Sequence, residues 1–429
     1  MVVKNGEMLI KISLTKLAIF LTVFFSAFNY IAIIPNNMDT QPWYIIASII
    51  SAVVVYLNNN SCVGRIVCFY LYLLISFLIV FCIYGIVENS VSDVYRNLGT
   101  YISLFTVSYV FYIGFKRGLI NSSQIFIFIC VWFIFGILQK FFNFDTTFIL
   151  ENRTSSGRGV TSLAPEPTFY AIMISLLYIL YYYARVHEGV VENLFLNKTF
   201  IIVLFQVFFL ASSSMMMLVW IIGLCLFVSL NIIKYVFILD FKKILSVFFL
   251  IVAFVFVFVF LFDSVDVSGM RFYKLFMDLN NGIYLVSQDA SVNDRLAHVY
   301  FPFYGVVSNN LLPGGVSSFS HYLEMKGEVL SGFFWYGAIT NKIMSYFGTL
   351  LYELGFLSFP FFFYISLLVF YFIYRFKFDI NIVTSVFILL VILFLSVPLS
   401  NPLSVGVLVL ISLNYKKTMG KASEVISNN

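Results

Sequence analysis

Charge is scarce in this sequence. Only 10% of the 429 residues are charged, whereas roughly a quarter of the residues in a soluble domain are. The few lysines and arginines are spread over many short segments, so the sequence lacks the dense basic patch that nucleic-acid binding requires, and we expect no nucleic-acid partner. With 61% hydrophobic and 20% aromatic residues, the chain is predicted to be an all-α polytopic integral membrane protein.

Three further absences narrow the interpretation. Of the five cysteines, four fall in hydrophobic runs and Cys62 lies in a short loop, which excludes a disulfide framework. We find no internal repeat. The sequence also has no aspartate-rich metal motif, so we expect no metal and no cofactor. No small-residue cleavage site follows the first hydrophobic segment, so this segment is predicted to be retained as the first helix.

Long hydrophobic runs dominate the chain. A helix crosses the hydrocarbon layer in about 20 residues, and on this measure we predict about twelve membrane spans: 17–34, 42–57, 67–87, 98–115, 124–142, 168–184, 199–211, 215–236, 244–262, 346–374, 381–397 and 403–414. The span 199–211 is short and ends at three serines. We therefore expect a tilted or half-buried helix whose end reaches into a cavity, with Ser213 as a candidate substrate contact.

Basic residues predict the orientation of these spans. With the N-terminus inside, 16 of the 25 lysines and arginines lie on the cytoplasmic side, and Arg96 is the only one in a short outer loop. The positive-inside rule thus predicts cytoplasmic N- and C-termini. Residues 1–429 form one transmembrane domain with two larger outer loops, 143–167 and 263–343. Within the second, 271–279 and 294–307 are predicted to be short amphipathic helices at the membrane surface.

The predicted spans themselves contain almost no ionisable residues. Lys140, near the end of its span, and Glu353 are the clear exceptions. Ion-coupled transporters place charged or broken-helix sites near the bilayer centre, so this pattern points instead to a site at the outer interface. A substrate with a lipid anchor and a polar head fits such a site.

Four outer arginines are candidates for binding that head. Arginine suits phosphate because its planar fork donates two parallel hydrogen bonds and keeps its charge. We predict that Arg153, Arg158, Arg271 and Arg295 cradle a diphosphate and, if it is a leaving group, stabilise the charge that develops on it. The alternative is structural: each arginine extends to the lipid headgroups or pairs with a nearby carboxylate.

Glu166 and the outer histidines are candidate general bases. Glu166 is held extended between Pro165 and Pro167; it either takes a proton from an attacking sugar hydroxyl or only favours the start of the following helix. His298 and His321 lie on the outer side, whereas His187 is predicted in a cytoplasmic loop. Either outer histidine is suited to proton transfer near neutral pH, and a structural role is the alternative for both.

Four segments, in this order along the chain, resemble bacterial O-antigen polymerases, the Wzy-type enzymes. The arginine, glycine and Glu-Pro segment of that family is similar to RTSSGRGVTSLAPEPTFYA, and its serine-containing helix junction to LASSSMMMLVWIIGL. Its large-loop segment, with an arginine, an amphipathic helix and a Pro-Gly turn, is similar to NDRLAHVYFPFYGVVSNNLLPGGVSSF. The helix that closes the loop is similar to SYFGTLLYELGFLSFPFFF.

The resemblance implies a GT-C-like glycosyltransferase at the periplasmic face of the bacterial inner membrane. It implies that a growing glycan is transferred from undecaprenyl diphosphate to the sugar of an incoming lipid-linked repeat unit, with a chain-length regulator as a further candidate partner. In this hypothesis Arg158 and Arg295 bind the donor diphosphate, Arg153 and Arg271 assist, and Glu166 or an outer histidine activates the acceptor hydroxyl.

Two other functions stay open at this point. O-antigen ligases resemble the polymerases but carry a histidine, then Asn, Ser or Gln, then nine residues and a glycine. Counting back from Gly355 places Ser345 in the second position and Met344 where the histidine belongs, which favours a polymerase; His321 and Gly332 have nearly the same spacing, so a ligase is not excluded. A flippase or exporter of lipid-linked oligosaccharides needs a cationic cavity inside the membrane, which the uncharged spans do not offer.

Overall fold

The computed structural model describes residues 2–31, 41–58, 63–84, 91–144, 159–190, 192–238, 290–330, 334 and 342–427. In these ranges every regular element is a helix. The helices are α1 Val2–Ala27, α2 Trp43–Asn58, α3 Arg65–Tyr84, α4 Val91–Lys116, α5 Ser122–Phe142, α6 Pro167–Glu188, α7 Lys198–Phe205, a π-helix Gln206–Leu210, α8 Ser214–Ile238, α12 Ala290–Ser308, α13 Phe319–Leu330, α14 Tyr346–Leu354, a 3-10 helix Gly355–Ser358, α15 Phe359–Arg375, α16 Ile380–Leu395 and α17 Pro402–Ser427.

Six of these helical stretches are long and apolar enough to cross a membrane: Arg65–Tyr84, Tyr95–Lys116, Ser122–Phe142, Pro167–Glu188, Ser214–Lys234 and Tyr346–Arg375. Each coincides with a predicted span. Five further predicted spans coincide with shorter apolar helices, and the predicted span 244–262 lies outside the described residues. The chain is therefore a polytopic membrane protein in which the total of twelve crossings stays a prediction.

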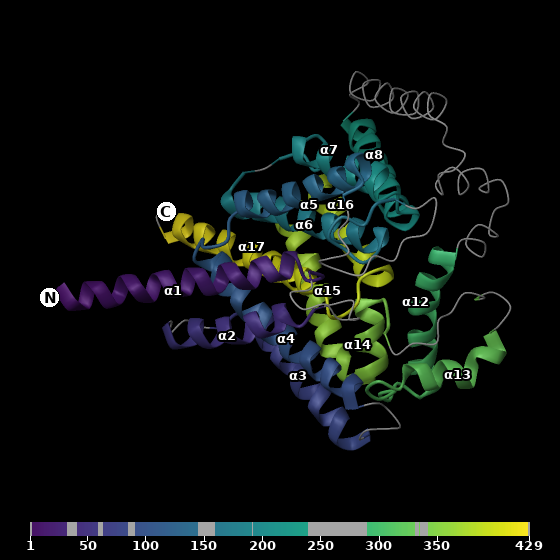
Figure 1. The fold of residues 1–429 in the computed structure, drawn as a ribbon. Coiled ribbons are helices and arrows are strands. Elements are labelled where there is room, and N and C mark those ends of the chain that lie inside the picture. Colours follow the sequence, from purple (N-terminus) through teal and green to yellow (C-terminus); the bar gives the residue numbers. More distant parts are fainter. Residues whose placement is uncertain are drawn as a thin grey trace.

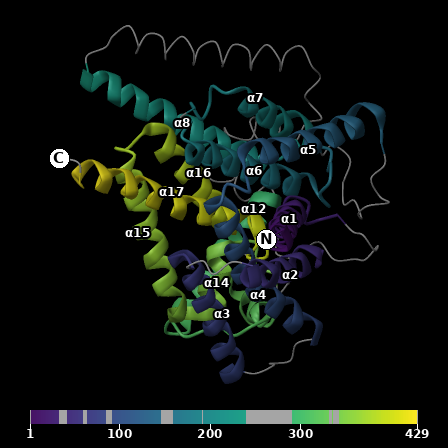
Figure 2. The same ribbon diagram turned by 90° about the vertical axis from the view of Figure 1, so that its left-hand side faces the viewer.

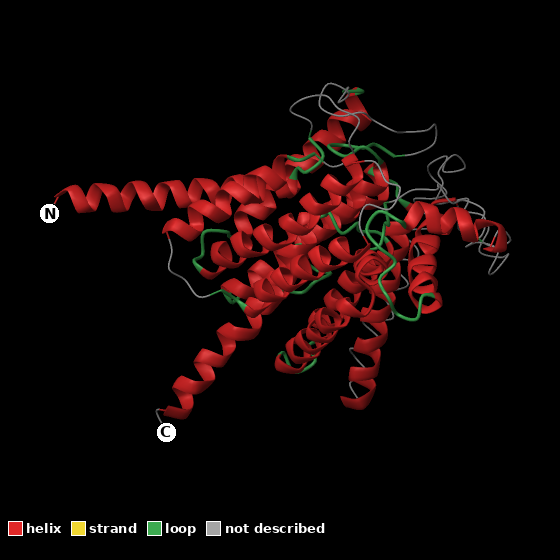
Figure 3. Ribbon diagram, turned by 90° about the horizontal axis from the view of Figure 1, so that it is seen from below, coloured by secondary structure: helices red, strands yellow, loops and turns green. Residues whose placement is uncertain are grey.

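The two ends of the chain project from the same side of the helix bundle (Figure 1). Helices α12 and α13 lie on the opposite side, and α12 runs across the direction of α1 rather than along it. The view along α1 in Figure 2 and the view from below in Figure 3 agree with this arrangement. Helix α12 therefore lies across one end of the bundle, at the side opposite to the two chain ends.

Helix α6 is the central helix of the bundle. It contacts α5, α16 and α17, and 83% of its span is buried inside the protein. Pro167 occupies its first turn, where a missing N–H costs nothing, and Gly189 ends it in the left-handed conformation with φ 88°. With 22 residues, α6 is about 33 Å long, which is long enough to cross the hydrocarbon layer of a membrane.

The predicted span 346–374 is broken at Gly355. This residue has φ 53° and ψ −134°, and a Cβ atom there would lie 2.6 Å from the carbonyl oxygen of Leu311. Only glycine fits this backbone and this contact. The Phe356 N–H donates to the same Leu311 oxygen at 2.9 Å, so the break between α14 and α15 holds the loop that follows α12 against the bundle.

Several predicted boundaries differ from the structure. Helix α1 begins well before residue 17 and ends at Ala27, because the helix continues into the polar residues ahead of the hydrophobic run. The prediction that His187 lies in a loop is wrong: it belongs to the last turn of α6. The short span 199–211 is confirmed as α7 with its π-helix, and the helix predicted at 294–307 is confirmed as α12; segment 271–279 lies outside the described residues.

Candidate functional site

The segment that leads into α6 is packed into the bundle. The Val160 N–H donates to the Leu210 carbonyl oxygen at 2.8 Å, at the end of the π-helix. The Ser162 N–H donates to Gln139 Oε1 at 2.6 Å and its hydroxyl to the Trp132 carbonyl oxygen at 2.8 Å, both on α5. These bonds to two different helices fix the backbone just ahead of α6, as a positioned site requires.

Gly159 begins this packed segment. A Cβ atom there would lie 2.2 Å from the carbonyl oxygen of Ala211, so any side chain would push the segment away from the π-helix. Arg158, which precedes Gly159 directly, lies outside the described residues, as do Arg153 and Arg271. The proposed cradle of four arginines is thus described only at Arg295.

Arg295 lies on α12 and is buried against the first turn of α6. Only 5% of its surface is exposed. Its guanidinium carbon is 5.7 Å from the centre of the Phe169 ring, and the Phe169 ring lies 5.6 Å from that of Tyr30 at the end of α1. Residues distant in sequence therefore converge where the transverse helix meets the start of the central one.

Part of the hydrogen-bonding capacity of Arg295 is not used within the described structure. Its Nε and Nη1 atoms are buried and have no hydrogen-bond partner there. Burial lowers the pKa of the Arg295 guanidinium, while the nearby Asp294, Glu166 and Tyr30 raise it; arginine stays protonated in either case. A buried cation with unmet donors favours an anionic ligand.

Lys342 brings a second cation to the same place. Its ammonium nitrogen is 5.5 Å from the centre of the Phe169 ring, the ring that Arg295 also approaches. Sequence reasoning missed this residue, because it lies in no recognisable motif. One feature of the sequence indicates its importance: few basic residues occur on the predicted outer side, and Lys342 is one of them.

Glu166 precedes α6 as its N-cap residue, in an extended conformation with φ −141° and ψ 152°. Its side chain makes no capping hydrogen bond, so the structural alternative for Glu166 is the electrostatic one, an acid placed before the first helical turn. Its carboxylate is close enough to raise the pKa of Arg295. The structure thus brings two predicted site residues, Glu166 and Arg295, from the two different outer loops close enough for their charges to interact.

His298 joins this cluster one turn further along α12. Its Nε2 atom lies 3.5 Å from Asp294 Oδ1, and its buried Nδ1 atom has no hydrogen-bond partner within the described structure. The imidazole is 5% exposed. His298 thus lies near the Asp294 carboxylate, and its Nδ1 atom can bond to a ligand.

The other two predicted site residues lie apart from this cluster. His321 is exposed on α13 and lines a separate pocket of about 370 Å³. Ser213 is 5% exposed and its hydroxyl has no partner in the described structure; it follows Ala211, the residue that Gly159 contacts. Ser213 thus borders the packed segment ahead of α6 rather than Arg295.

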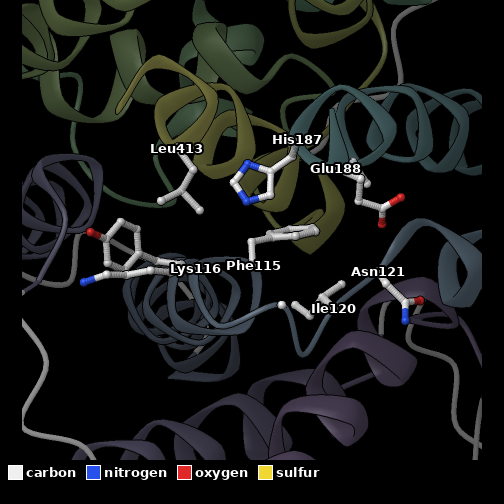
Figure 4. Close-up of a pocket in the computed structure, with 10 residues that line it drawn as sticks. Phe115, Lys116, Ile120, Asn121, His187, Glu188 and Leu413 are labelled. Carbon is white, nitrogen blue, oxygen red and sulfur yellow. The ribbon is translucent and has the colours of Figure 1, made fainter. Parts of the chain in front are cut away.

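A larger cavity, of about 460 Å³, lies at the other end of α6 (Figure 4). Its polar groups pair with protein groups. Glu188 accepts hydrogen bonds from the Ser122 N–H at 2.7 Å and the Ser122 hydroxyl at 2.6 Å, His187 bonds to Asn414 at 2.8 Å, and Lys116 lies over the Tyr112 ring. Figure 4 shows Lys116 and Glu188 on opposite sides of the cavity, so no charge converges on its centre.

No protein family, curated protein or solved structure matches this chain. The resemblance to O-antigen polymerases therefore rests on the four segments quoted above and on their order. Across the described ranges, no three His, Cys, Asp or Glu side chains gather closely enough to hold a metal ion. The chemistry that these ranges support is that of Arg295, Lys342, Glu166 and His298.

Proposed function

We propose that this protein is a polysaccharide repeat-unit polymerase, a glycosyltransferase of the bacterial inner membrane. It transfers a glycan from undecaprenyl diphosphate to a sugar hydroxyl of the next lipid-linked repeat unit, at the periplasmic face. The observation that carries the proposal is the buried Arg295, whose Nε and Nη1 donors lack partners within the described structure and whose positive charge interacts with the negative charge of Glu166. The order of the four family-like segments supports it.

A diphosphate fits the unmet donors of Arg295. Each of these two nitrogens can donate to an oxygen of the diphosphate, and Lys342, which also approaches the Phe169 ring, supplies a second positive charge. Donors that are already fixed and desolvated stabilise developing negative charge most effectively. The two cations therefore bind the donor and stabilise its leaving group.

Glu166 completes the reaction as the general base. The acceptor hydroxyl oxygen forms a bond to the anomeric carbon of the donor glycan, and its proton passes to the Glu166 carboxylate. The bond between the anomeric carbon and the diphosphate oxygen breaks, and its electron pair leaves with undecaprenyl diphosphate. His298, which lies near Asp294, contacts the substrate from the neighbouring turn of α12.

Chain length tests the proposal directly. We expect Arg295→Ala to lower the transfer rate by about 10²- to 10³-fold, the usual loss when a transition-state donor is removed, and so to leave single repeat units in the host. Arg295→Lys keeps the charge without the fork, so an intermediate loss is expected. Lys116→Ala, at the other end of the bundle, is the matched control. Unaltered long glycans from a normally inserted Arg295→Ala protein would refute the proposal.

A strain that lacks the gene and an assay of the purified protein separate the polymerase from a ligase and from a flippase. A ligase predicts that deletion leaves long polymer unattached to its final acceptor, whereas a polymerase predicts that the polymer itself is lost. A flippase predicts that the purified protein moves lipid-linked oligosaccharide across vesicles without lengthening it. Polymer length in the deletion strain, together with a vesicle translocation assay, distinguishes all three.

A further inference from the structure

The pocket that contains His321 has no role in the transfer step described above. It has a volume of about 370 Å³, within the range of small-molecule sites. It lies where the end of α12, the following loop, the start of α13 and α14 meet. Its lining residues are Tyr84, Gly305, Ser308, Asn309, Gly314, Gly315, Val316, Ser318, His321, Tyr322, Met325 and Tyr352.

The chemistry of this lining differs from that of the Arg295 cluster. Among the described residues its lining contains no Asp, Glu, Lys or Arg, and His321 is its one ionisable group besides the tyrosines, so the described lining offers no fork for a phosphate and no carboxylate for a cation. Tyrosine rings provide flat apolar surface together with hydroxyl groups. Ser308 and Asn309 add acceptor oxygens, since the Ser308 hydroxyl donates to the Gly305 carbonyl oxygen and the Asn309 amide nitrogen donates to the carbonyl oxygens of Leu312 and Pro313. A neutral ligand that carries many hydroxyls and has an apolar face matches this composition, and a sugar ring has both properties.

Two glycines hold the wall of the pocket in place. A Cβ atom at Gly314 would lie 2.7 Å from Tyr352 Cζ, and one at Gly305 would lie 3.0 Å from Tyr352 Cε2. The Gly314 N–H also donates to the Tyr352 carbonyl oxygen at 2.8 Å, and the Tyr352 hydroxyl lies 3.2 Å from Ser318 Oγ. The Tyr352 ring is therefore fixed before any ligand arrives, which lowers the entropy cost of binding.

Tyr322 supplies an unmet polar group. Its side chain is 9% exposed and packs on Tyr352 with ring centres 5.6 Å apart. Its hydroxyl is buried and makes no hydrogen bond of normal geometry in the described structure. Burial raises the pKa of Tyr322 and the nearby Ser308 hydroxyl lowers it, but the Ser308 hydroxyl donates its own hydrogen bond to the Gly305 carbonyl oxygen. A buried hydroxyl without a partner is costly, and a ligand hydroxyl would remove that cost.

The pocket lies next to the Arg295 cluster along α12. His298 and Gly305 are seven residues apart on α12, so they lie on the same face of the helix, about 10 Å from one another. The ring of Phe319 bridges them, since its centre is 6.1 Å from that of His298 and 5.1 Å from that of Tyr352. A glycan whose reacting end lies at Glu166 and Arg295 can thus extend along α12 into the pocket.

We propose that this pocket binds one neutral sugar residue of the lipid-linked glycan, beside the reacting end. The sugar packs its C–H face on Tyr352 and bonds its hydroxyls to Tyr322 and Asn309. The inference rests on the proposed function for the identity of the glycan. Because its described lining offers no fork for a phosphate, the pocket recognises the sugar and not the diphosphate, and so contributes to selection of the repeat unit.

Sugar binding without a lipid diphosphate tests this proposal. The probe is the lipid-free repeat-unit oligosaccharide released by mild acid from the host's lipid-diphosphate-linked repeat unit, and its affinity for the purified full-length protein is measured by calorimetry. We expect Ser308→Trp, which fills the pocket, to weaken binding at least tenfold. Val307→Trp is the matched control, because Val307 is the neighbouring residue, is 68% exposed and does not line the pocket.

The outcomes separate the pocket from the transfer reaction. Arg295→Ala should bind the lipid-free probe as the unaltered protein does, because the probe has no phosphate. If Arg295→Ala keeps both probe binding and long glycans, the proposed function fails and the sugar pocket stands. Equal probe binding by Ser308→Trp and Val307→Trp, or no binding by the unaltered protein, overturns the pocket, whatever Arg295→Ala does to chain length. Thermal unfolding checks that both tryptophan variants are folded.

Discussion

The two ends of α6 differ in how their charged groups are satisfied. At the Glu188 end, the carboxylate accepts two hydrogen bonds from Ser122. At the Pro167 end, Arg295 is buried and two of its nitrogen atoms have no partner within the described structure. The larger cavity lies at the satisfied end. Unmet hydrogen-bonding capacity, rather than cavity size, therefore marks the candidate site.

Energetics explain why this difference is informative. A buried polar group left without a partner costs about 1 to 3 kcal/mol, and a charged group costs more. Such a group is found where a bound ligand offsets this cost, and ionisable groups with shifted pKa values indeed cluster at functional sites. The carboxylate of Glu188 carries no such cost, because Ser122 of α5 donates hydrogen bonds to it.

The largest expected effect comes from Glu166→Gln. Gln has nearly the same shape but cannot take a proton from the acceptor hydroxyl, so we expect the transfer rate to fall by about 10²- to 10⁴-fold. The KM for the lipid-linked donor should stay near its original value, because the cations still bind the diphosphate. Glu188→Gln, the matched carboxylate at the other end of α6, should leave transfer unchanged. Equal losses of transfer rate in Glu166→Gln and Glu188→Gln would contradict the assignment of the candidate site to the Pro167 end of α6.

Much of the fold could be predicted from the sequence, because hydrophobic run length is a local property. The helix at 168–184 and the short span 199–211 follow from composition alone, and Pro165 and Pro167 determine where α6 begins. Its C-terminal end was placed too early. Arg185 and His187 are polar, yet they extend the helix to Glu188, because polar residues in a last helical turn complement its dipole.

The site was predictable in part. Glu166 and Arg295 were recognised as unusual charges beside hydrophobic segments, and the structure brings them together. Lys342 and Tyr30 were missed, because their approach to Phe169 joins segments far apart in the chain, and no local pattern encodes such contacts. For the same reason the sequence could not separate His298, beside Arg295, from His321, which lines a separate pocket.

Lys342→Gln should have a smaller effect than Glu166→Gln or Arg295→Ala. It removes one of the two cations beside Phe169 and leaves the arginine fork intact, so we expect roughly a tenfold loss in kcat/KM, the scale of one charge-assisted hydrogen bond. Most of the loss should appear in KM for the donor and should grow at low salt, where electrostatic attraction is least screened. Lys342→Arg serves as the charge-preserving control, and a loss equal to that of Lys342→Gln would argue against a role for the charge.

The smallest expected effect is at the satisfied end and concerns stability alone. Glu188→Ala removes the acceptor that joins the end of α6 to the start of α5, and losing such a helix-start acceptor costs about 1 kcal/mol. Glu188→Gln keeps one acceptor oxygen, so its unfolding midpoint in detergent should fall between those of Glu188→Ala and the unaltered protein. Glycan chain length should be normal in both variants. Short glycans from a normally inserted Glu188→Gln protein would mean that this end of α6 also takes part in transfer.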